Sequence, residues 1–370
     1  MKNAEDKKYL QECFKLAQKG AGYVSPNPLV GCVIVKDGKI IGRGYHKQFG
    51  KAHAEVNAFK RAKNNVKGAT LYVNLEPCSY FGKTPPCTEV IISKGIKRVV
   101  VGTRDPNTLV NGAGIRKLRT AGIQVVEGIL EPEAKQLNEF FHKYITQKLP
   151  FVTLKMAQTL DGKIADYQGN SRWISNLETR KKVHELRAKY DAILVGANTV
   201  HKDDPELTVR LVKGRNPIRV VLDGSLSVSK KSKIFLTATE NPTLLFTSKK
   251  GYLKNLKKAS FLKNMGVKIF VIKSKSTIIS LKTVLNILAK NSIASILVEG
   301  GSEVVAQFIK NRFADKIIYT IAPKILGKGT PAISDKIRFP ITNPFELQDV
   351  TFQQCGTDIM IEGYIKNREK

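Results

Sequence analysis

The first third of the sequence contains four side chains whose types and spacing suit metal chemistry. His53 and Glu55 lie two residues apart, and eight residues separate Cys78 from Cys87. One imidazole and two thiolates give a zinc ion three protein ligands and leave its fourth tetrahedral position to water, as in catalytic zinc sites. Zinc lowers the pKa of that water to about 7, and Glu55 is suited to move its proton to a leaving nitrogen. The pattern predicts hydrolytic deamination of a nucleobase-like ring.

The spacing of His53 and Glu55 restricts where a helix can begin. Side chains two residues apart do not share a face of a regular helix, so both can serve one metal only in the first turn. We therefore predict a helix over residues 53–63 that starts at His53. Three further cysteines are expected to be inert small hydrophobic side chains: Cys13, Cys32 and Cys355.

A second candidate site follows an apolar segment that ends at Val298. The next residues, Glu299 to Ser302, form a glycine-rich turn before a predicted helix over 304–309. Such a strand-to-helix turn exposes backbone N–H groups that can bind an anionic phosphate. The same glycines also suit a plain connecting turn. No G-x-G-x-x-G motif accompanies the turn, so the sequence gives no support for a Rossmann dinucleotide site.

Two alternating helix and strand patterns, separated by a short polar link at 147–150, indicate two α/β domains. We predict a first domain over 1–147 and a second over 150–370. Apolar strands between helices indicate sheets that are covered on both faces. The first domain is predicted to have further helices at 9–17, 89–94, 115–121 and 132–145 and strands at 29–35, 39–41, 69–73, 97–101 and 123–126. The second is predicted to have a further helix at 177–188 and strands at 151–157, 192–195, 218–222, 243–246, 267–272, 295–298 and 317–321.

Length and composition exclude several classes of protein. The chain has 370 residues, of which 42% are hydrophobic and 25% charged, and this excludes a disordered chain. No apolar run approaches the roughly 18 residues of a membrane helix, and the charged N-terminus lacks the apolar core of a signal peptide. Five cysteines in a chain of this length do not make a disulfide scaffold, so we expect a cytoplasmic protein.

The charge balance is strongly basic. There are 62 lysines and arginines against 31 aspartates and glutamates, which gives a net charge of +31. Such a field attracts anions, whether phosphorylated metabolites, nucleotides or nucleic acid. The lysines are spread along the chain without interleaved aromatic residues, which favours single solvated lysines over a dedicated nucleic-acid surface.

Several longer motifs resemble one known family, the bifunctional deaminase/reductases of riboflavin biosynthesis. Four segments resemble the deaminase domain of that family: 26–34, 53–58, 76–87 and 105–107. Three others resemble its reductase domain: 155–165, 172–175 and 203–210. The sequence departs from the family at Tyr80, where the family usually has histidine, and at Lys83, where it usually has arginine.

The resemblance implies an α/β fold, with an N-terminal cytidine-deaminase-like three-layer domain and a C-terminal dihydrofolate-reductase-like domain. It implies a hydrolase and an oxidoreductase in one chain: zinc-hydroxide deamination of 2,5-diamino-6-(5-phosphoribosylamino)pyrimidin-4-one, then NADPH-dependent reduction of the ribosyl group to ribityl. The implied zinc ligands are His53, Cys78 and Cys87, with Glu55 as the catalytic residue. The residues implied to contact NADPH are Ala157, Trp173, Thr199, Asp203, Gly301 and Ser302. Those implied to contact the substrate are Ser171, Arg187, Leu207, Arg210 and Glu299.

Two other functions are open from the sequence. A zinc deaminase acting on a base in RNA would use the basic surface as its platform, but the cysteine spacing and the second domain disfavour it. A non-enzymatic zinc-stabilised module is disfavoured by Glu55 and by the missing fourth ligand. The expected partners are a phosphorylated pyrimidine and NADPH, with no membrane and no nucleic acid. Self-association into a homo-oligomer is compatible with the sequence.

Overall fold

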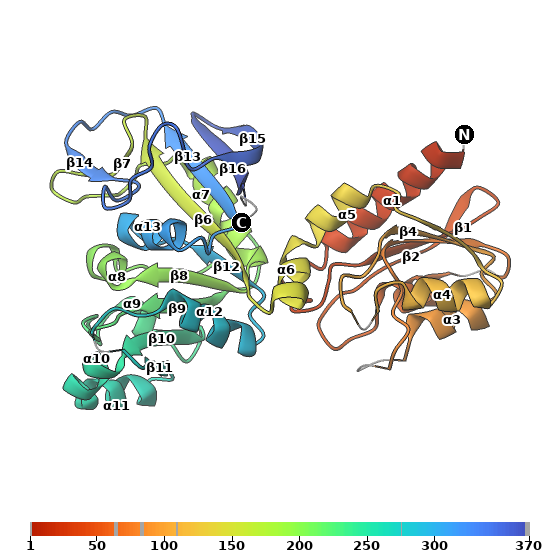
Figure 1. The fold of residues 1–370 in the computed structure, drawn as a ribbon, viewed down its shortest axis with the longest axis horizontal. Coiled ribbons are helices and arrows are strands. Elements are labelled where there is room, and N and C mark those ends of the chain that lie inside the picture. The colour runs from red at the N-terminus through yellow and green to blue at the C-terminus, as the bar shows by residue number, and fades with distance from the viewer. Residues whose placement is uncertain (1, 63–65, 82–84, 109, 275, 367–370) are drawn as a thin grey trace. The chain divides into compact units, whose positions relative to one another are not determined.

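The structure is a computed structural model of the chain, and it describes residues 2–62, 66–81, 85–108, 110–274 and 276–366. The departure from the family at Lys83 and the predicted helix end at residue 63 lie outside the described residues. The chain divides into two compact units, Met1–Leu149 and Pro150–Lys370 (Figure 1). None of the described helices is both long and apolar enough to cross a membrane.

A mixed sheet forms the middle layer of the first unit. Within the described residues its five strands run in the order β2 (Lys39–Tyr45), β1 (Gly31–Lys36), β3 (Thr70–Leu75), β4 (Arg98–Thr103) and β5 (Gln124–Glu127). Strand β1 is antiparallel to β2 and β3, whereas β3, β4 and β5 are parallel. Asp37 and Gly38 join β1 to β2 with positive φ angles of 50° and 71°, which confirms the predicted hairpin.

Helices cover both faces of this sheet because its strands are apolar on both sides. In β1, Cys32 and Ile34 pack into one buried cluster, and the alternating Val33 and Val35 pack into another. The first cluster lies under the helices α2 (Ala54–Arg61), α3 (Cys87–Ser93) and α4 (Ala113–Thr120) (Figure 1). The second lies under α1 (Lys2–Gln18), beside which α5 (Glu131–Leu137) packs. The three-layer arrangement expected for this unit is confirmed.

The prediction of a single continuous helix over 132–145 is wrong. The structure divides it at Asn138 into α5 and α6 (Glu139–Gln147). The Asn138 side chain accepts a hydrogen bond from the Leu29 N–H (2.7 Å) and donates one to the Leu29 carbonyl (3.0 Å). These bonds fasten the break to the loop before β1. Because the partner lies 109 residues away, no local pattern reveals the break.

A larger sheet forms the second unit. Within the described residues its nine strands run in the order β11 (Lys268–Ile272), β10 (Thr243–Ser248), β9 (Ile218–Leu222), β8 (Ala192–Gly196), β12 (Ser295–Val298), β6 (Phe151–Thr159), β13 (Lys316–Ala322), β16 (Asp358–Ile365) and β15 (Leu347–Cys355). Neighbours from β11 to β13 are parallel, and β16 and β15 add an antiparallel edge. A ribbon of β7 (Lys163–Asp166) and β14 (Gly329–Pro331) accompanies the sheet.

Helices connect the parallel strands of the second unit. They are α7 (Leu177–Lys189), α8 (Ala197–Asp203), α9 (Lys233–Leu236), α10 (Lys249–Lys254), α11 (Leu256–Asn264), α12 (Leu281–Lys290) and α13 (Ser302–Lys310). The strands expected at 243–246 and 267–272 are confirmed as β10 and β11, but α8 to α12, the β7–β14 ribbon and the β15–β16 hairpin were not predicted. Of these helices, α12 carries the clear signal, because its buried residues 281, 284, 285 and 288 have helical spacing.

The strand order places a crevice at one edge of the second sheet. Strands β8, β12 and β6 are parallel neighbours, so their carboxyl ends meet. The chain proceeds outward from β8 to β11 and then returns to β12, and ligands bind at such a reversal of strand order. Ala157 lies near the end of β6, Thr199 follows β8 within α8, and Gly301 follows β12. Three residues predicted to contact the cofactor therefore come together here.

A buried ion pair fastens α1 to the first sheet, and its removal is expected to destabilise that unit. The two terminal nitrogens of the Arg98 guanidinium, Nη1 and Nη2, donate to the Asp6 carboxylate at 2.8 and 2.7 Å, and the Tyr72 hydroxyl donates to the same carboxylate at 3.1 Å. Asp6→Ala leaves the Arg98 charge buried without its partner, so we expect the free energy of unfolding of this unit to fall by about 3–5 kcal/mol. Chemical denaturation measures the change.

The exposed pair of Arg43 with Glu12, at 3.3 Å, provides the control for this prediction. Glu12→Ala is expected to cost less than about 1 kcal/mol, because water screens exposed charges. Equal effects of Asp6→Ala and Glu12→Ala would show that burial does not set the strength of the Asp6 pair.

Candidate active sites

The local backbone places His53 and Glu55 at one helix end. His53 is the residue before α2, with extended backbone angles of −71° and 170°, and Glu55 is the second residue of that helix. Because the chain is still entering the helix at His53, the two side chains are not held to the divergent directions of a regular helix. Glu55 is buried, with 3% of its surface exposed. The helix start that the zinc hypothesis requires is present.

Three donor atoms converge beside Glu55. The Nδ1 atom of His53 lies 3.6 Å from Cys78 Sγ and 3.3 Å from Cys87 Sγ, and the three donors lie within 4.8 Å of one another. Cys78 follows β3, and Cys87 is the first residue of α3, where its N–H donates to Cys78 Sγ at 3.4 Å. Donors about 3.5 Å apart match a tetrahedron with metal bonds of about 2.0–2.3 Å. The set therefore fits zinc.

The electrostatics of the cluster also suit a cation. The Cys87 thiol donates a hydrogen bond that lowers the pKa of Cys78 to about 4, and the same bond raises the pKa of Cys87. Hydrogen bonding to Cys78 raises the pKa of His53. Burial, followed by repulsion from Cys78, raises the pKa of Glu55. Within the described residues Glu55 Oε2 has no hydrogen-bond partner, so the site contains a buried acceptor that a bound ligand or water could satisfy.

A cavity of about 310 Å³ opens beside this cluster, and several of its polar residues were given no role from the sequence. Asn27, His46, Asp105 and Asn107 line it together with Tyr80. His46 is fixed at both ring nitrogens, by the Ala52 carbonyl and by the Asn27 amide, each at 3.2 Å. Burial raises the pKa of Asp105 to about 6. The sequence does not reveal the roles of Asn27 and Asp105, because the prolines and asparagines beside them are equally typical of ordinary turns.

The second unit contains a cleft of about 490 Å³ at the carboxyl ends of β6, β8 and β12. Nine of the eleven residues predicted to contact cofactor or substrate line it: Ala157, Ser171, Trp173, Arg187, Thr199, Asp203, Arg210, Glu299 and Gly301. Ser302 lines an adjoining cavity of about 480 Å³ that shares Ser171, Thr199, Asp203 and Gly301 with the first. Leu207 does not line either cavity and is buried, with 4% of its surface exposed.

Hydrogen bonds fix three of the predicted cofactor residues. Ser171 Oγ donates to Asp203 at 2.9 Å, and the Gly301 N–H donates to Thr199 Oγ1 at 3.1 Å. Trp173 is 60% exposed, and the Arg180 guanidinium lies over its ring at 4.0 Å. The Ser171–Asp203 contact joins residues 32 apart in the sequence, and the Gly301–Thr199 contact joins residues 102 apart. Both lie at the edge of the sheet where the parallel strands end.

A buried charge network forms the floor of the cleft. Arg187 donates to both carboxylate oxygens of Glu299, at 2.7 and 2.8 Å, and to the Thr208 carbonyl at 3.1 Å. Burial opposes the charge of Glu299, but Arg187 outweighs that effect and lowers the pKa of Glu299 to about 2. Arg187 is thus already engaged by a carboxylate. The more exposed Arg210 contacts Glu206 and Thr208 at the rim.

The sequence analysis assigned no role to Lys155 and His184, two titratable residues of this cleft. Burial lowers the pKa of Lys155, and burial and the neighbouring arginines lower that of His184 to about 4. His184 Nδ1 accepts a hydrogen bond from the Arg210 N–H at 2.8 Å and is therefore held neutral. Lys155 lies between Leu154 and Met156 in the largely apolar strand β6, and a lysine in such a position is a signal from which its role could have been predicted.

Comparison with known proteins places both units. The family of the RibD C-terminal domain matches residues 150–361, and the cytidine and deoxycytidylate deaminase zinc-binding region matches residues 3–103. The riboflavin biosynthesis protein RibD of Aquifex aeolicus (strain VF5) is 47% identical over 357 residues, covering 96% of this chain and 97% of that protein. The RibD of Bacillus amyloliquefaciens is 41% identical over 363 residues, covering 97% of this chain and 96% of that protein.

Solved structures give the same result. The crystal structure of a diaminohydroxyphosphoribosylaminopyrimidine deaminase/5-amino-6-(5-phosphoribosylamino)uracil reductase from Thermotoga maritima is 42% identical, with a TM-score of 0.87. The alignment covers 99% of this chain and all of that one. RibD of Acinetobacter baumannii, in one crystal form, is 34% identical with the same TM-score of 0.87.

A chain that joins these two units is a deaminase and a reductase at once: its first domain is a cytidine-deaminase-like zinc-binding domain, and its second is a dihydrofolate-reductase-like domain that uses NAD(P)H. The relatives at 47% and 41% identity cover 96% and 97% of this chain, so the matches extend over both domains. The chain belongs to the RibD family, the bifunctional deaminase/reductases of riboflavin biosynthesis. The fold class and the two cofactors expected from the resemblance are confirmed, and the RNA deaminase is not supported.

Removal of zinc with a chelator is expected to reveal a reactive thiolate at Cys78. Because its pKa lies at about 4, Cys78 is ionised at every pH above about 6, and its alkylation rate should hardly change between about pH 6 and about pH 8. The alkylation rate of an ordinary thiol, with a pKa of about 8.5, rises about 80-fold from about pH 6 to about pH 8. Iodoacetamide labelling followed by peptide mass spectrometry measures the rate.

Two controls accompany this labelling experiment. Added zinc should protect Cys78, and the buried Cys13 and Cys32 should stay unlabelled in the folded chain. A labelling rate at Cys78 that rises about 80-fold with pH would contradict the ionised thiol.

Proposed function

We propose that the first domain, 1–147, deaminates 2,5-diamino-6-(5-phosphoribosylamino)pyrimidin-4-one and that the second, 150–370, reduces the ribosyl group of the product to ribityl with NADPH. The Thermotoga maritima relative is a diaminohydroxyphosphoribosylaminopyrimidine deaminase and 5-amino-6-(5-phosphoribosylamino)uracil reductase, which supports this substrate. The observation that carries the deaminase is the convergence of His53, Cys78 and Cys87 beside a buried carboxylate oxygen that has no partner in the described residues. Such an oxygen is suited to take a proton from an attacking water.

The residues of the first domain divide the work of deamination. His53, Cys78 and Cys87 would hold zinc, which supplies the Lewis acidity that makes water nucleophilic at neutral pH. Glu55 takes a proton from the attacking water and delivers it to the amino nitrogen, so the C–N bond breaks and ammonia leaves. A carboxylate whose pKa is raised by burial suits both halves of this transfer, since it must accept and then release the proton.

The cavity beside the cluster orients the pyrimidine. Asn27 and Asp105 present amide and carboxyl groups to it, and these suit the ring's own donors and acceptors. Tyr80 lines the cavity with 44% of its surface exposed, where its phenol ring can stack on the substrate.

The cleft of the second domain provides a place for the dinucleotide across the ends of β6, β8 and β12. We assign Ala157, Trp173, Thr199, Asp203, Gly301 and Ser302 to NADPH. The N-terminus of the nine-residue helix α13, at Ser302, faces the adjoining cavity and suits a phosphate. NADPH supplies the hydride that reaches the ribose C1′ once the sugar ring has opened.

The floor and rim of the cleft serve the substrate. Ser171 and Arg210 are assigned to its phosphate, and Leu207 supports the loop that carries Arg210. Glu299 is held by Arg187 in an orientation that leaves it facing Lys155, whose ammonium can donate the proton that the ribose ring oxygen needs when the ring opens. Arg187, which also lines the cleft, then acts on the substrate through Glu299.

We also propose a cytoplasmic location and self-association of the chain. All five cysteines are free thiols, which supports a reducing, cytoplasmic compartment. Self-association is proposed on the exposed apolar side chains of the edge strand β15, where Phe352 is 80% exposed.

Glu55→Gln is expected to remove deamination while zinc remains bound, because an amide occupies the same space but cannot accept the proton. The turnover number for ammonia release should fall by about 10²–10⁴. Ammonia release and zinc content are measured on the same preparation, and reduction of separately supplied deaminated intermediate is the internal control. Undiminished ammonia release would end the assignment of Glu55 as the proton carrier.

Arg210→Ala is expected to raise the KM of the reductase for its phosphorylated intermediate about tenfold with little change in kcat, because a charge-assisted contact to the phosphate is lost. Steady-state NADPH oxidation measures both constants. Arg338→Ala removes an exposed arginine that does not line either cavity and serves as the matched control. A tenfold rise in KM for both variants would indicate a loss of general attraction instead of a phosphate contact.

A further inference from the structure

We propose that Glu76 is a positioning residue of the deaminase: its carboxylate fixes together the strand end that carries Cys78 and the loop that carries Asp105. This inference rests on the proposed role of the His53–Cys78–Cys87 set in binding zinc. Glu76 follows β3 and is buried, with 3% of its surface exposed.

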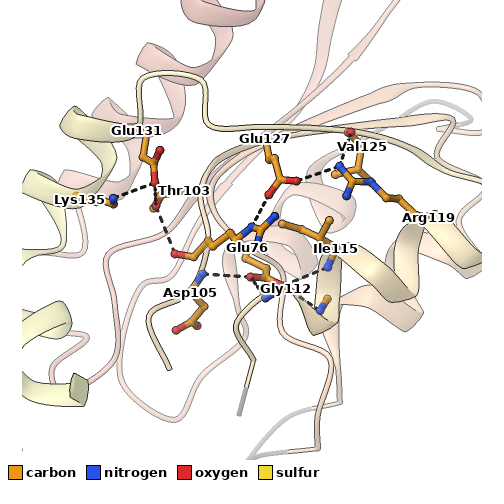
Figure 2. Close-up of polar contacts among 12 residues, drawn as sticks. Glu76, Thr103, Asp105, Gly112, Ile115, Arg119, Val125, Glu127, Glu131 and Lys135 are labelled. Carbon is orange, nitrogen blue, oxygen red and sulfur yellow. Dashed lines mark hydrogen bonds and ion pairs between the residues drawn. The ribbon is translucent and has the colours of Figure 1, made fainter. Parts of the chain in front are cut away.

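The Glu76 carboxylate accepts hydrogen bonds from backbone N–H groups, where a buried carboxylate often pairs with a cationic side chain. Its Oε2 accepts hydrogen bonds from the N–H groups of Asp105 (3.2 Å) and Gly112 (2.9 Å). Its Oε1 accepts from those of Gly114 (2.9 Å) and Ile115 (3.2 Å). Figure 2 shows the Glu76 carboxylate among these backbone nitrogens, whereas the nearby Glu127 and Glu131 contact cationic side chains. One side chain therefore satisfies four buried donors.

The chemistry of a carboxylate suits this arrangement. Each of its two oxygens can accept two hydrogen bonds, and it has no donor. Gly112, Gly114 and Ile115 belong to the start of α4, where N–H groups have no partner inside the helix and the helix dipole favours a negative charge. A glutamine amide in the same position would turn its NH2 group toward two N–H donors. The four bonds therefore depend on the carboxylate itself.

The strand end that bears Cys78 is held tightly on the same side. The Glu76 N–H donates to the Thr103 carbonyl at 3.0 Å and extends the pairing of β3 with β4. A side chain at Gly114 would place its Cβ 2.1 Å from the Pro77 carbonyl oxygen, so the first turn of α4 packs directly on the residue before Cys78. Displacement of α4 from Glu76 would therefore move the backbone that presents the Cys78 thiol.

The second connection runs to the substrate cavity. The Asp105 N–H is fixed by Glu76, and the Asp105 carboxylate accepts a hydrogen bond from the Asn107 N–H at 2.8 Å. Both Asp105 and Asn107 line the cavity beside the metal cluster. Glu76, which also lines this cavity, thus connects the strand end that bears Cys78 with Asp105 and Asn107 through hydrogen bonds to backbone.

A general loss of stability must be separated from a loss of position. The test compares Glu76→Gln with Asp6→Ala in the full chain, because Asp6 is a buried carboxylate of the same unit that anchors α1 on the other face of the sheet. Zinc affinity is measured by competition with a chromophoric chelator, and kcat and KM are measured for ammonia release. All assays are run below the melting temperature of both variants, with reductase turnover as the internal control.

Glu76→Gln is expected to weaken zinc binding about tenfold or more and to raise the deaminase KM, while reductase turnover is unchanged. Asp6→Ala is expected to lower the melting temperature at least as much and to leave zinc affinity and KM as in the unaltered chain. Glu76→Asp keeps the charge but is one methylene shorter, so it should give an intermediate zinc affinity and a second test if Glu76→Gln fails to fold.

Two results would overturn the inference. One is a Glu76→Gln variant with the original zinc affinity and KM; the other is an Asp6→Ala variant whose zinc affinity and KM change as much as those of Glu76→Gln. Failure of the proposed function has a different signature, because the unaltered chain would then bind no stoichiometric zinc or release no ammonia.

Discussion

The structure of the first domain depends on one electrostatic constraint: two thiols, an imidazole and a carboxylate must stay together where little water reaches them. Buried anionic groups are costly without a cation, and here the pKa of Glu55 is raised by burial while that of Cys78 is lowered by the Cys87 thiol. The donors come from the start of α2, the strand end after β3 and the start of α3. The three-layer scaffold brings these elements together, because α2 and α3 pack on the same face of the sheet that contains β3.

The first domain binds a cation, whereas the ligands of the second domain are anions. Parallel strands bring their carboxyl ends together, and the floor beneath them is a single carboxylate, Glu299, surrounded by Arg187 and Lys155. The ion pair with Arg187 keeps Glu299 charged. Burial lowers the pKa of Lys155, so its ammonium is a better proton donor than that of an exposed lysine. The net charge of +31 acts in the same direction, because it attracts both the substrate phosphate and the dinucleotide from solution.

Side-chain chemistry was easier to predict from the sequence than side-chain partners. The donors His53, Cys78 and Cys87 are recognisable because few other residue types bind zinc, and the buried strands because their patterns are local. Partners far apart in the chain are not recognisable in this way: Arg187 meets Glu299 across 112 residues. Asn138 interrupts a helix by bonding to Leu29, and Glu76 accepts hydrogen bonds from the Asp105 loop and from the start of α4, 29 to 39 residues further along the chain. Lys155 could have been found, because a lysine within an apolar strand requires a reason.

The most direct test of the central claim is zinc-edge X-ray absorption spectroscopy of the zinc-loaded chain. The account predicts two sulfur scatterers at about 2.3 Å and two nitrogen or oxygen scatterers at about 2.0 Å, with the multiple scattering of one imidazole. A third sulfur would contradict the account. So would a second imidazole, because His46, whose ring centre lies 5.4 Å from that of His53, would then close the site that the deaminase needs open.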